Sequence, residues 1–222
     1  MPHETSILVN MFKKIWILLP LFFLISSTVL GQEKEKKKNT SEDADTTIVL
    51  SKGRVVYKNR IYRQNAPYLS MGYGAGYGFE STQIEQNMSV SYQHFIKKVG
   101  LQLGYHSSSD TKIWWRSDQK LNELFLGIGT RWENSRYNFS VFGGPCYSYG
   151  SYIVIINKDS VDQEYPYRFK TVGFHAEAQA TYKISYDIGI GLSVYASINN
   201  QYSVVGTQVH LYFSTAFVRN YN

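Results

Sequence analysis

The sequence predicts an all-β fold, a closed up-and-down barrel of eight antiparallel strands that crosses a lipid bilayer. Three observations support this prediction. Apolar and polar residues alternate with a period of two over eight segments that follow Pro67. The face opposite the apolar one is rich in glycine and poor in charge. The segments are joined alternately by short turns and longer loops, an asymmetry typical of transmembrane barrels.

The chain opens with a segment that has the form of a secretory signal peptide. A pair of lysines precedes the apolar run 15–25, and small residues follow it. A membrane anchor is the alternative, but the run is short of the roughly 20 apolar residues that a spanning helix needs. We therefore expect a signal peptide over residues 1–31, with translation from Met11. Gln32 stands where a lipoprotein signal would carry its cysteine, so no lipid anchor is expected.

Residues 32–66 form a charged segment that we expect to lie in the periplasm. The stretches 33–38 and 41–45 are charged and lack aromatic residues, which predicts a disordered linker. The stretch 51–65 is basic. Nucleic-acid binding is one interpretation of such a patch, but export argues against a nucleic-acid partner and favours a solvated or headgroup-facing segment. Whether residues 46–66 are ordered is left open.

The barrel is expected over residues 67–222. Its eight predicted strands are 68–79, 86–96, 99–108, 121–132, 136–148, 167–183, 186–198 and 204–217. The fifth segment loses its alternation at Gly143–Gly144–Pro145, which predicts a β-bulge. The two longest loops, 109–120 and 149–166, fall on the same rim and contain apolar runs. Such runs suggest hairpins that extend the barrel, or a contact surface.

The apolar face of these strands is expected to contact hydrocarbon. In the first segment, residues from Leu69 to Phe79 alternate with small residues at every second position. A soluble barrel would turn its polar face to water and would need many charges there. Within the segments that face has few clearly charged residues, namely Glu123, Arg131 and Glu177. We therefore expect glycine to line a narrow lumen, where it leaves room for larger residues such as Phe125.

Aromatic residues support the same placement. The chain has 19 Tyr and 4 Trp, and many of them lie near the ends of the predicted strands. Amphipathic rings prefer the depth of lipid headgroups and form girdles around membrane barrels. The residues expected in these girdles are Tyr68, Tyr77, Trp114, Trp115, Trp132, Tyr137, Tyr182, Tyr186 and Tyr202.

Together these patterns resemble the small eight-stranded outer-membrane barrels of the OmpX and OmpA-transmembrane type, in the form common among Bacteroidota, which includes PorT-like proteins. The resemblance covers about residues 67–222 and rests on pattern, not on a motif. It implies a location in the cell outer membrane, contact with outer-membrane lipid and lipopolysaccharide, and insertion by the barrel assembly machinery. Such barrels usually end on an aromatic residue, whereas this chain continues beyond Phe217, so Tyr221 or an internal segment would serve as that signal.

Five lumen residues form the candidate polar cluster: Glu123, Arg131, His175, Glu177 and His210. Their expected role is structural, as a salt-bridged plug in a closed lumen. Glu177 and His210 are expected near mid-membrane and Arg131 near the periplasmic rim. Buried Glu177 requires a partner, and Arg131, His175 and His210 are the candidates. No catalytic, cofactor-binding or metal-binding residues are predicted, and the single cysteine, Cys146, excludes an intramolecular disulfide.

Three functions remain open at this point. The first is a non-enzymatic barrel with a structural, adhesive or binding role through its extracellular loops. The second is an enzyme that modifies lipid A, for which His106, Ser107 and Asp110 are the candidate polar residues. The third is a component of an envelope secretion or gliding apparatus, which would be the envelope protein partner implied by the PorT-like resemblance.

Overall fold

The computed structural model describes residues 48–50, 53–96, 99–110, 119–158 and 161–220. The regular elements of these residues are β-strands arranged in two sheets. Among them there is no helix long and apolar enough to cross a membrane. Several predicted features lie outside the described residues: the signal peptide, the charged stretches 33–38 and 41–45, Trp114 and Trp115.

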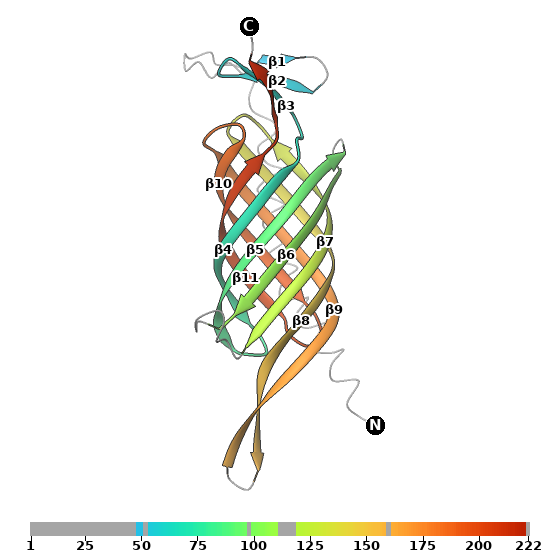
Figure 1. Ribbon diagram of the computed structural model, residues 1–222, viewed down its shortest axis with the longest axis vertical. Coiled ribbons are helices and arrows are strands. Elements are labelled where there is room, and N and C mark those ends of the chain that lie inside the picture. Colours follow the sequence, from blue (N-terminus) through green and yellow to red (C-terminus); the bar gives the residue numbers. More distant parts are fainter. Residues whose placement is uncertain (1–47, 51–52, 97–98, 111–118, 159–160, 221–222) are drawn as a thin grey trace, which may run out of the picture. The chain divides into compact units, whose positions relative to one another are not determined.

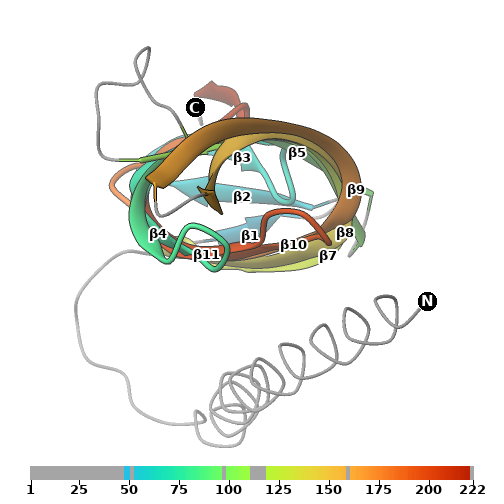
Figure 2. The ribbon, with the colours of Figure 1, turned by 90° about the horizontal axis from the view of Figure 1, so that it is seen from below.

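Eight strands form a closed barrel in which each strand pairs with its neighbours in sequence and β11 pairs with β4 (Figures 1 and 2). The barrel strands are β4 (Tyr68–Gly78), β5 (Gln83–Ile96), β6 (Val99–Ser109), β7 (Lys120–Glu133), β8 (Tyr137–Lys158), β9 (Val161–Lys183), β10 (Ile188–Ile198) and β11 (Val204–Ser214). All eight pairings are antiparallel. The predicted eight-stranded up-and-down barrel is confirmed.

The longest predicted loop, 149–166, is a β-hairpin. Strands β8 and β9 remain paired as far as Lys158 and Val161. The pairing of β7 with β8 ends at Ser151, and that of β10 with β9 ends at Phe174. Beyond these points β8 and β9 pair with each other alone among the described residues, so this hairpin continues past the other barrel strands, as Figure 1 shows.

The predicted bulge in the fifth strand is wrong. The pairs Phe125↔Cys146 and Ile128↔Gly143 have the same register, so no extra residue enters either strand. The ladder merely pauses at Gly144 and Pro145, because proline has no N–H to donate. A Cβ on Gly144 would overlap the backbone of β7, which explains the glycine. The sequence alternation fails because β8 turns apolar side chains into the lumen at this point.

The remaining four strands form a second sheet, the terminal sheet. They are β1 (Ile48–Leu50), β2 (Arg54–Tyr57), β3 (Arg60–Arg63) and β12 (Phe217–Asn220), in the order β1-β2-β3-β12. Lys58 and Asn59, with φ of 46° and 59°, form the two-residue turn between β2 and β3. Positive φ at both positions is the geometry of a tight hairpin turn. Residues 48–63 of the charged segment therefore contain three strands.

Phe217 does not belong to the last barrel strand, contrary to the prediction. Strand β11 ends at Ser214, and Phe217 begins β12 and pairs with Tyr62 of β3. The chain leaves the barrel at Thr215, whose N–H donates to the carbonyl of Pro67 at 3.2 Å. This bond keeps the end of the chain beside the segment that enters β4, so the two ends continue as paired strands.

The terminal sheet packs on the barrel through one apolar cluster. Its members are Val55, Tyr57, Tyr62, Ala66, Tyr186 and Ala216. The ring of Tyr62 stacks on that of Tyr186, in the turn between β9 and β10, with centroids 4.6 Å apart. Burial, and then the nearby Glu133 carboxylate, raise the pKa of Tyr186, so its hydroxyl stays neutral.

The outer surface of the barrel is an apolar belt. Over the middle of the barrel most outward residues are exposed, up to 70 % for Val172 and 66 % for Ile128, whereas Ser107, Ser109 and Asn122 toward the long-loop rim are buried. Large exposed members of the belt are Met71, Tyr73, Leu101, Leu103, Leu124, Leu126, Ile128, Val172, Phe174, Ile190, Leu192, Val209 and Leu211. The intervening residues point inward and are buried. A closed barrel with this surface spans a lipid bilayer, as the alternation predicted.

The aromatic girdle is confirmed in part. Tyr77, Trp132, Tyr137 and Tyr182 are exposed near strand ends. Three of the predicted members, Tyr68, Tyr186 and Tyr202, are wrong, because each is at most 2 % exposed. Tyr68 has the inward parity of β4, and the other two lie in turns that fold over the ends of the barrel.

A charge on the belt tests which side meets lipid. Leu126 lies at the centre of β7 and pairs with Leu103 of β6. We expect Leu126→Arg to lower the free energy of unfolding by about 2–4 kcal/mol, because arginine is costly at the bilayer midplane. The measurement is equilibrium urea unfolding in lipid vesicles. Gln83→Arg, at an exposed position at the end of β5, is the control and is expected to change stability little. Equal losses in the two variants would contradict the belt.

Candidate functional site

The lumen is closed by side chains at two levels. Near the short turns, the aromatic residues Tyr68, Phe95, Phe142 and Tyr212 form one buried cluster. Near the long loops, a second buried cluster contains Leu121, Phe169, Tyr195, Tyr202 and Val204. Buried polar residues occupy the lumen between them. The interior of an eight-stranded barrel is just wide enough for such side chains to fill it.

Glycine makes this filling possible, as the sequence predicted. A Cβ on Gly104 would overlap the ring of Phe125, and a Cβ on Gly76 would lie 2.7 Å from the Tyr195 hydroxyl oxygen. Both glycines point inward from their strands. The large side chains of β7 and β10 therefore occupy space that the glycines of β6 and β4 leave free.

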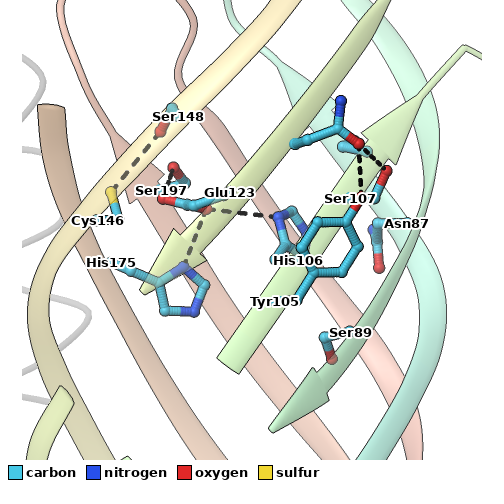
Figure 3. Close-up of polar contacts among 12 residues, drawn as sticks. Asn87, Ser89, Tyr105, His106, Ser107, Glu123, Cys146, Ser148, His175 and Ser197 are labelled. Carbon is cyan, nitrogen blue, oxygen red and sulfur yellow. Dashed lines mark hydrogen bonds and ion pairs between the residues drawn. The ribbon is translucent and has the colours of Figure 1, made fainter. Parts of the chain in front are cut away.

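Glu123 is the centre of a buried polar group in the lumen. Its side chain is fully buried, and its Oε2 atom lies 3.2 Å from Nδ1 of His175 and 3.5 Å from Nδ1 of His106 (Figure 3). Its Oε1 atom accepts a hydrogen bond from the Ser197 hydroxyl at 2.8 Å. We call Glu123, His106, His175 and Ser197 the Glu123 cluster. Its members come from β7, β6, β9 and β10, and each has the inward parity of its strand.

The Glu123 cluster is held by polar and aromatic neighbours. A buried carboxylate is costly without polar partners, and two imidazoles and one hydroxyl surround this one. The ring of His175 lies parallel to that of Phe125, with centroids 4.0 Å apart, and parallel to Tyr195 at 6.1 Å. These two rings hold the imidazole of His175 in position beside Glu123.

The five predicted polar residues lie in separate groups. His175 joins Glu123. Glu177 accepts a hydrogen bond of 2.7 Å from the amide of Gln102, which was not among its predicted partners. The three candidates for that role bond elsewhere: His175 to Glu123, Arg131 to Glu133, and His210 to Thr181. The lumen thus holds several local networks in place of one salt-bridged plug.

Arg131 belongs to a charged group at the rim of the short turns. The Glu133 carboxylate forms ion pairs with Arg131 and, at 2.7 Å, with Nζ of Lys183. Arg131 also donates to the Ala66 carbonyl at 3.0 Å, and its guanidinium carbon lies 4.4 Å from the centroid of Phe95. Glu133 and Lys183 were not predicted as members of this group, because both lie at strand ends, where turn residues were expected.

At the opposite rim, Glu85 is the acceptor for three hydroxyl groups. Ser81 and Ser108 donate to it at 2.8 Å and 2.5 Å, and Tyr202 donates to the same carboxylate. Burial and the neighbouring Glu85 raise the pKa of Tyr202, so its hydroxyl remains a donor. Glu80 accepts a hydrogen bond from the N–H of Ser203 at 2.6 Å. These bonds fix the turn 199–203 over the lumen.

The residues considered for hydrolysis are not assembled as a catalytic group. His106 points to Glu123, whereas the Ser107 hydroxyl donates to Asn122 at 3.1 Å. Successive residues of a strand project to opposite faces, so Ser107 cannot follow His106 into the lumen. No group of three or more His, Cys, Asp or Glu in the described part of the chain is arranged to hold a metal ion.

The barrel geometry places this chain in a structural class. Its closed eight-stranded sheet carries lipid-facing side chains outside and a polar, filled interior. The protein is a transmembrane β-barrel. No family model matches the chain, and no curated protein matches it.

Solved structures with a similar strand arrangement are small membrane barrels. Neisserial surface protein A is 8 % identical, with a TM-score of 0.47 over 67 % of this chain and 95 % of that one. Ail, the attachment invasion locus protein of Yersinia pestis, is 10 % identical, with a TM-score of 0.46 over 69 % and 99 %. The N-terminal β-barrel domain of Pseudomonas aeruginosa OprF is 14 % identical, with a TM-score of 0.44 over 66 % and 97 %.

Removing the charge of Glu123 tests the role of the Glu123 cluster. We expect Glu123→Gln to lower the free energy of unfolding by about 2–3 kcal/mol, because the carboxylate accepts from Ser197 and contacts two imidazoles, and hydrogen bonds to a charged group contribute about 1.5–3 kcal/mol. Glu177→Gln is the matched control, since its amide oxygen can still accept from Gln102. It is expected to cost about 0.5–1.5 kcal/mol. Urea unfolding in vesicles measures both, and equal losses would contradict a central role for Glu123.

Proposed function

We propose that this protein is a non-enzymatic outer-membrane barrel that acts through the surface on its long-loop rim, in an adhesive or binding role. The observation that carries the proposal is the combination of a filled lumen with a β8–β9 hairpin that extends past the other strands. A filled lumen leaves no path for solutes. The hairpin supplies surface that the barrel does not need for closure.

The base of the hairpin presents aromatic side chains. Tyr165 and Tyr167 are 49 % and 46 % exposed, and Tyr167 packs on Tyr152 with centroids 5.3 Å apart. Tyrosine is enriched in protein interfaces because it offers a large rigid surface with one polar atom. Tyr152 in turn contacts Phe169 and Tyr202 in the lumen cluster, at 5.9 Å and 6.0 Å. The hairpin is thereby supported by the packed interior.

The same proposal includes contact of the belt with outer-membrane lipid and lipopolysaccharide, and insertion by the barrel assembly machinery. The continuous apolar face supports the first part. The alternative of a lipid A-modifying enzyme is disfavoured because His106 and Ser107 point to different partners. Lipid A from cells with and without the gene is expected to have the same mass spectrum. A change in acylation would favour the enzyme as the function of this protein.

Loss of the hairpin is expected to abolish attachment without unfolding the barrel. Replacing residues 153–166 by a two-residue turn removes strand that pairs only within the hairpin. Across a panel of immobilised host-type proteins and glycans, cells that display this variant should attach to any surface that the wild type binds no better than cells without the barrel. Folding is checked by the heat-dependent gel mobility typical of barrels. The substitution Ser135→Ala, in a short turn at the other rim, is the control and should attach normally.

Electrical recording tests the filled lumen separately. The wild-type barrel in a planar bilayer is expected to show no stable channel. Replacing Phe95 and Phe142 by alanine removes two rings near the short turns only, so conductance is expected to stay low while the cluster near the long loops remains. Stable channels in the wild type would contradict a closed lumen.

A further inference from the structure

The four strands of the terminal sheet carry an unusual charge distribution. Their sequences, IVL, RVVY, RIYR and FVRN, contain four arginines and no acidic residue. Arg54, Arg63 and Arg219 are exposed. Within the described residues, none of these three forms an ion pair. At the barrel rim close by, Arg131 and Lys183 share the carboxylate of Glu133.

Two of the arginines are direct neighbours across the sheet. Arg54 of β2 and Arg63 of β3 are antiparallel partners, so their side chains project from the same face. Like charges placed directly opposite each other destabilise a sheet. The opposite face, with Val55 and Tyr62, is the one that packs on Tyr186 of the barrel. The arginine pair lies on the other face, where Arg54 and Arg63 are exposed although Val56 and Ile61 beside them on that face are buried.

A register shift brings a third arginine to this face. Phe217 pairs with Tyr62, but Arg219 pairs with Ile61, so the register of β12 and β3 changes by one residue between them. With the register of Phe217 maintained, Arg219 would have paired with Arg60 and would have projected toward the barrel. The shift turns it to the face of Arg63, as bulges commonly re-aim a side chain.

The position of this face relative to the lipid belt indicates its ligand. The N–H of Arg63 donates to the Ala216 carbonyl at 2.8 Å, two residues after β11 ends. In the barrel, the lipid-facing row of β4 begins at Leu69, and that of β11 ends at Phe213. These two residues are paired partners. Arg63 is thus a few residues beyond the hydrocarbon boundary. The most abundant anion at that depth is the phosphate of lipid headgroups.

We propose that Arg54, Arg63 and Arg219 bind the phosphate of an anionic lipid headgroup at the rim of the short turns. Guanidinium groups present paired donors that match the oxygens of a phosphate, and three of them on one face exceed the charge of one phosphate diester. Bound phosphate removes the repulsion between Arg54 and Arg63. The terminal sheet then holds the two ends of the chain to the membrane surface.

The test uses the full barrel purified in detergent and titrated with phosphatidylglycerol or phosphatidylcholine under native mass spectrometry. The wild type is expected to retain phosphatidylglycerol in preference to phosphatidylcholine. The double variant R54Q/R63Q should bind phosphatidylglycerol about tenfold more weakly, and R219Q should show a smaller loss. R54K/R63K keeps the charge without the paired donors and is expected to fall between them.

K58Q/R60Q is the matched control, because it removes the same charge from the turn and from the other face of the same sheet. It should bind like the wild type. If R54Q/R63Q and K58Q/R60Q lose phosphatidylglycerol binding equally, the lipid is attracted by the overall positive charge of the sheet, and the proposed site is wrong. Unchanged phosphatidylglycerol binding in R54Q/R63Q would also show that the proposed site is wrong. Separate samples contain inorganic phosphate or a glutamate-rich peptide. Arginine-dependent binding of either one, without retention of phosphatidylglycerol, would overturn the lipid as ligand. Gel mobility confirms that each variant is folded.

Discussion

Backbone hydrogen bonding in hydrocarbon is the constraint from which the rest of this structure follows. No water is available there to bond a free N–H or C=O, so a sheet in the bilayer must have no open edge. The pairing of β11 with β4 over eleven residue pairs, from Val204↔Gly78 to Ser214↔Tyr68, meets this requirement. Side chains then follow by parity, with one set in lipid and the other in a narrow lumen.

The narrow lumen explains why its polar residues are bonded in local groups. Each inward side chain faces strands on the far side of the barrel, so its partner is set by the tilt and register of the sheet. Glu123 on β7 meets His175 on β9 and Ser197 on β10, which are not its neighbours in the sheet. Buried clusters lie toward both rims, and the low local dielectric between them strengthens the hydrogen bonds of the Glu123 cluster.

Sequence alternation was sufficient to predict the barrel because lipid and lumen impose opposite demands on successive residues. Alternation failed as a guide in β8, where an inward position holds a large apolar residue. Phe142 is apolar yet points inward, because glycines opposite it leave room, and β8 therefore seemed to lose its phase. The inward positions of Glu123, His175 and Glu177 were predictable from parity. Their partners were not, since contacts across the lumen depend on the register of strands far apart in the sequence.

An even number of strands returns both ends of the barrel to the same rim, and closure makes them neighbours. The segment entering β4 and the segment leaving β11 are therefore in place to pair, as the bond from Thr215 to Pro67 shows. Strands β3 and β12 extend this seam beyond the bilayer, where water makes an open sheet edge tolerable. The seam also collects arginines from both ends of the chain. Charges 156 residues apart, at Arg63 and Arg219, share one face because the barrel is closed.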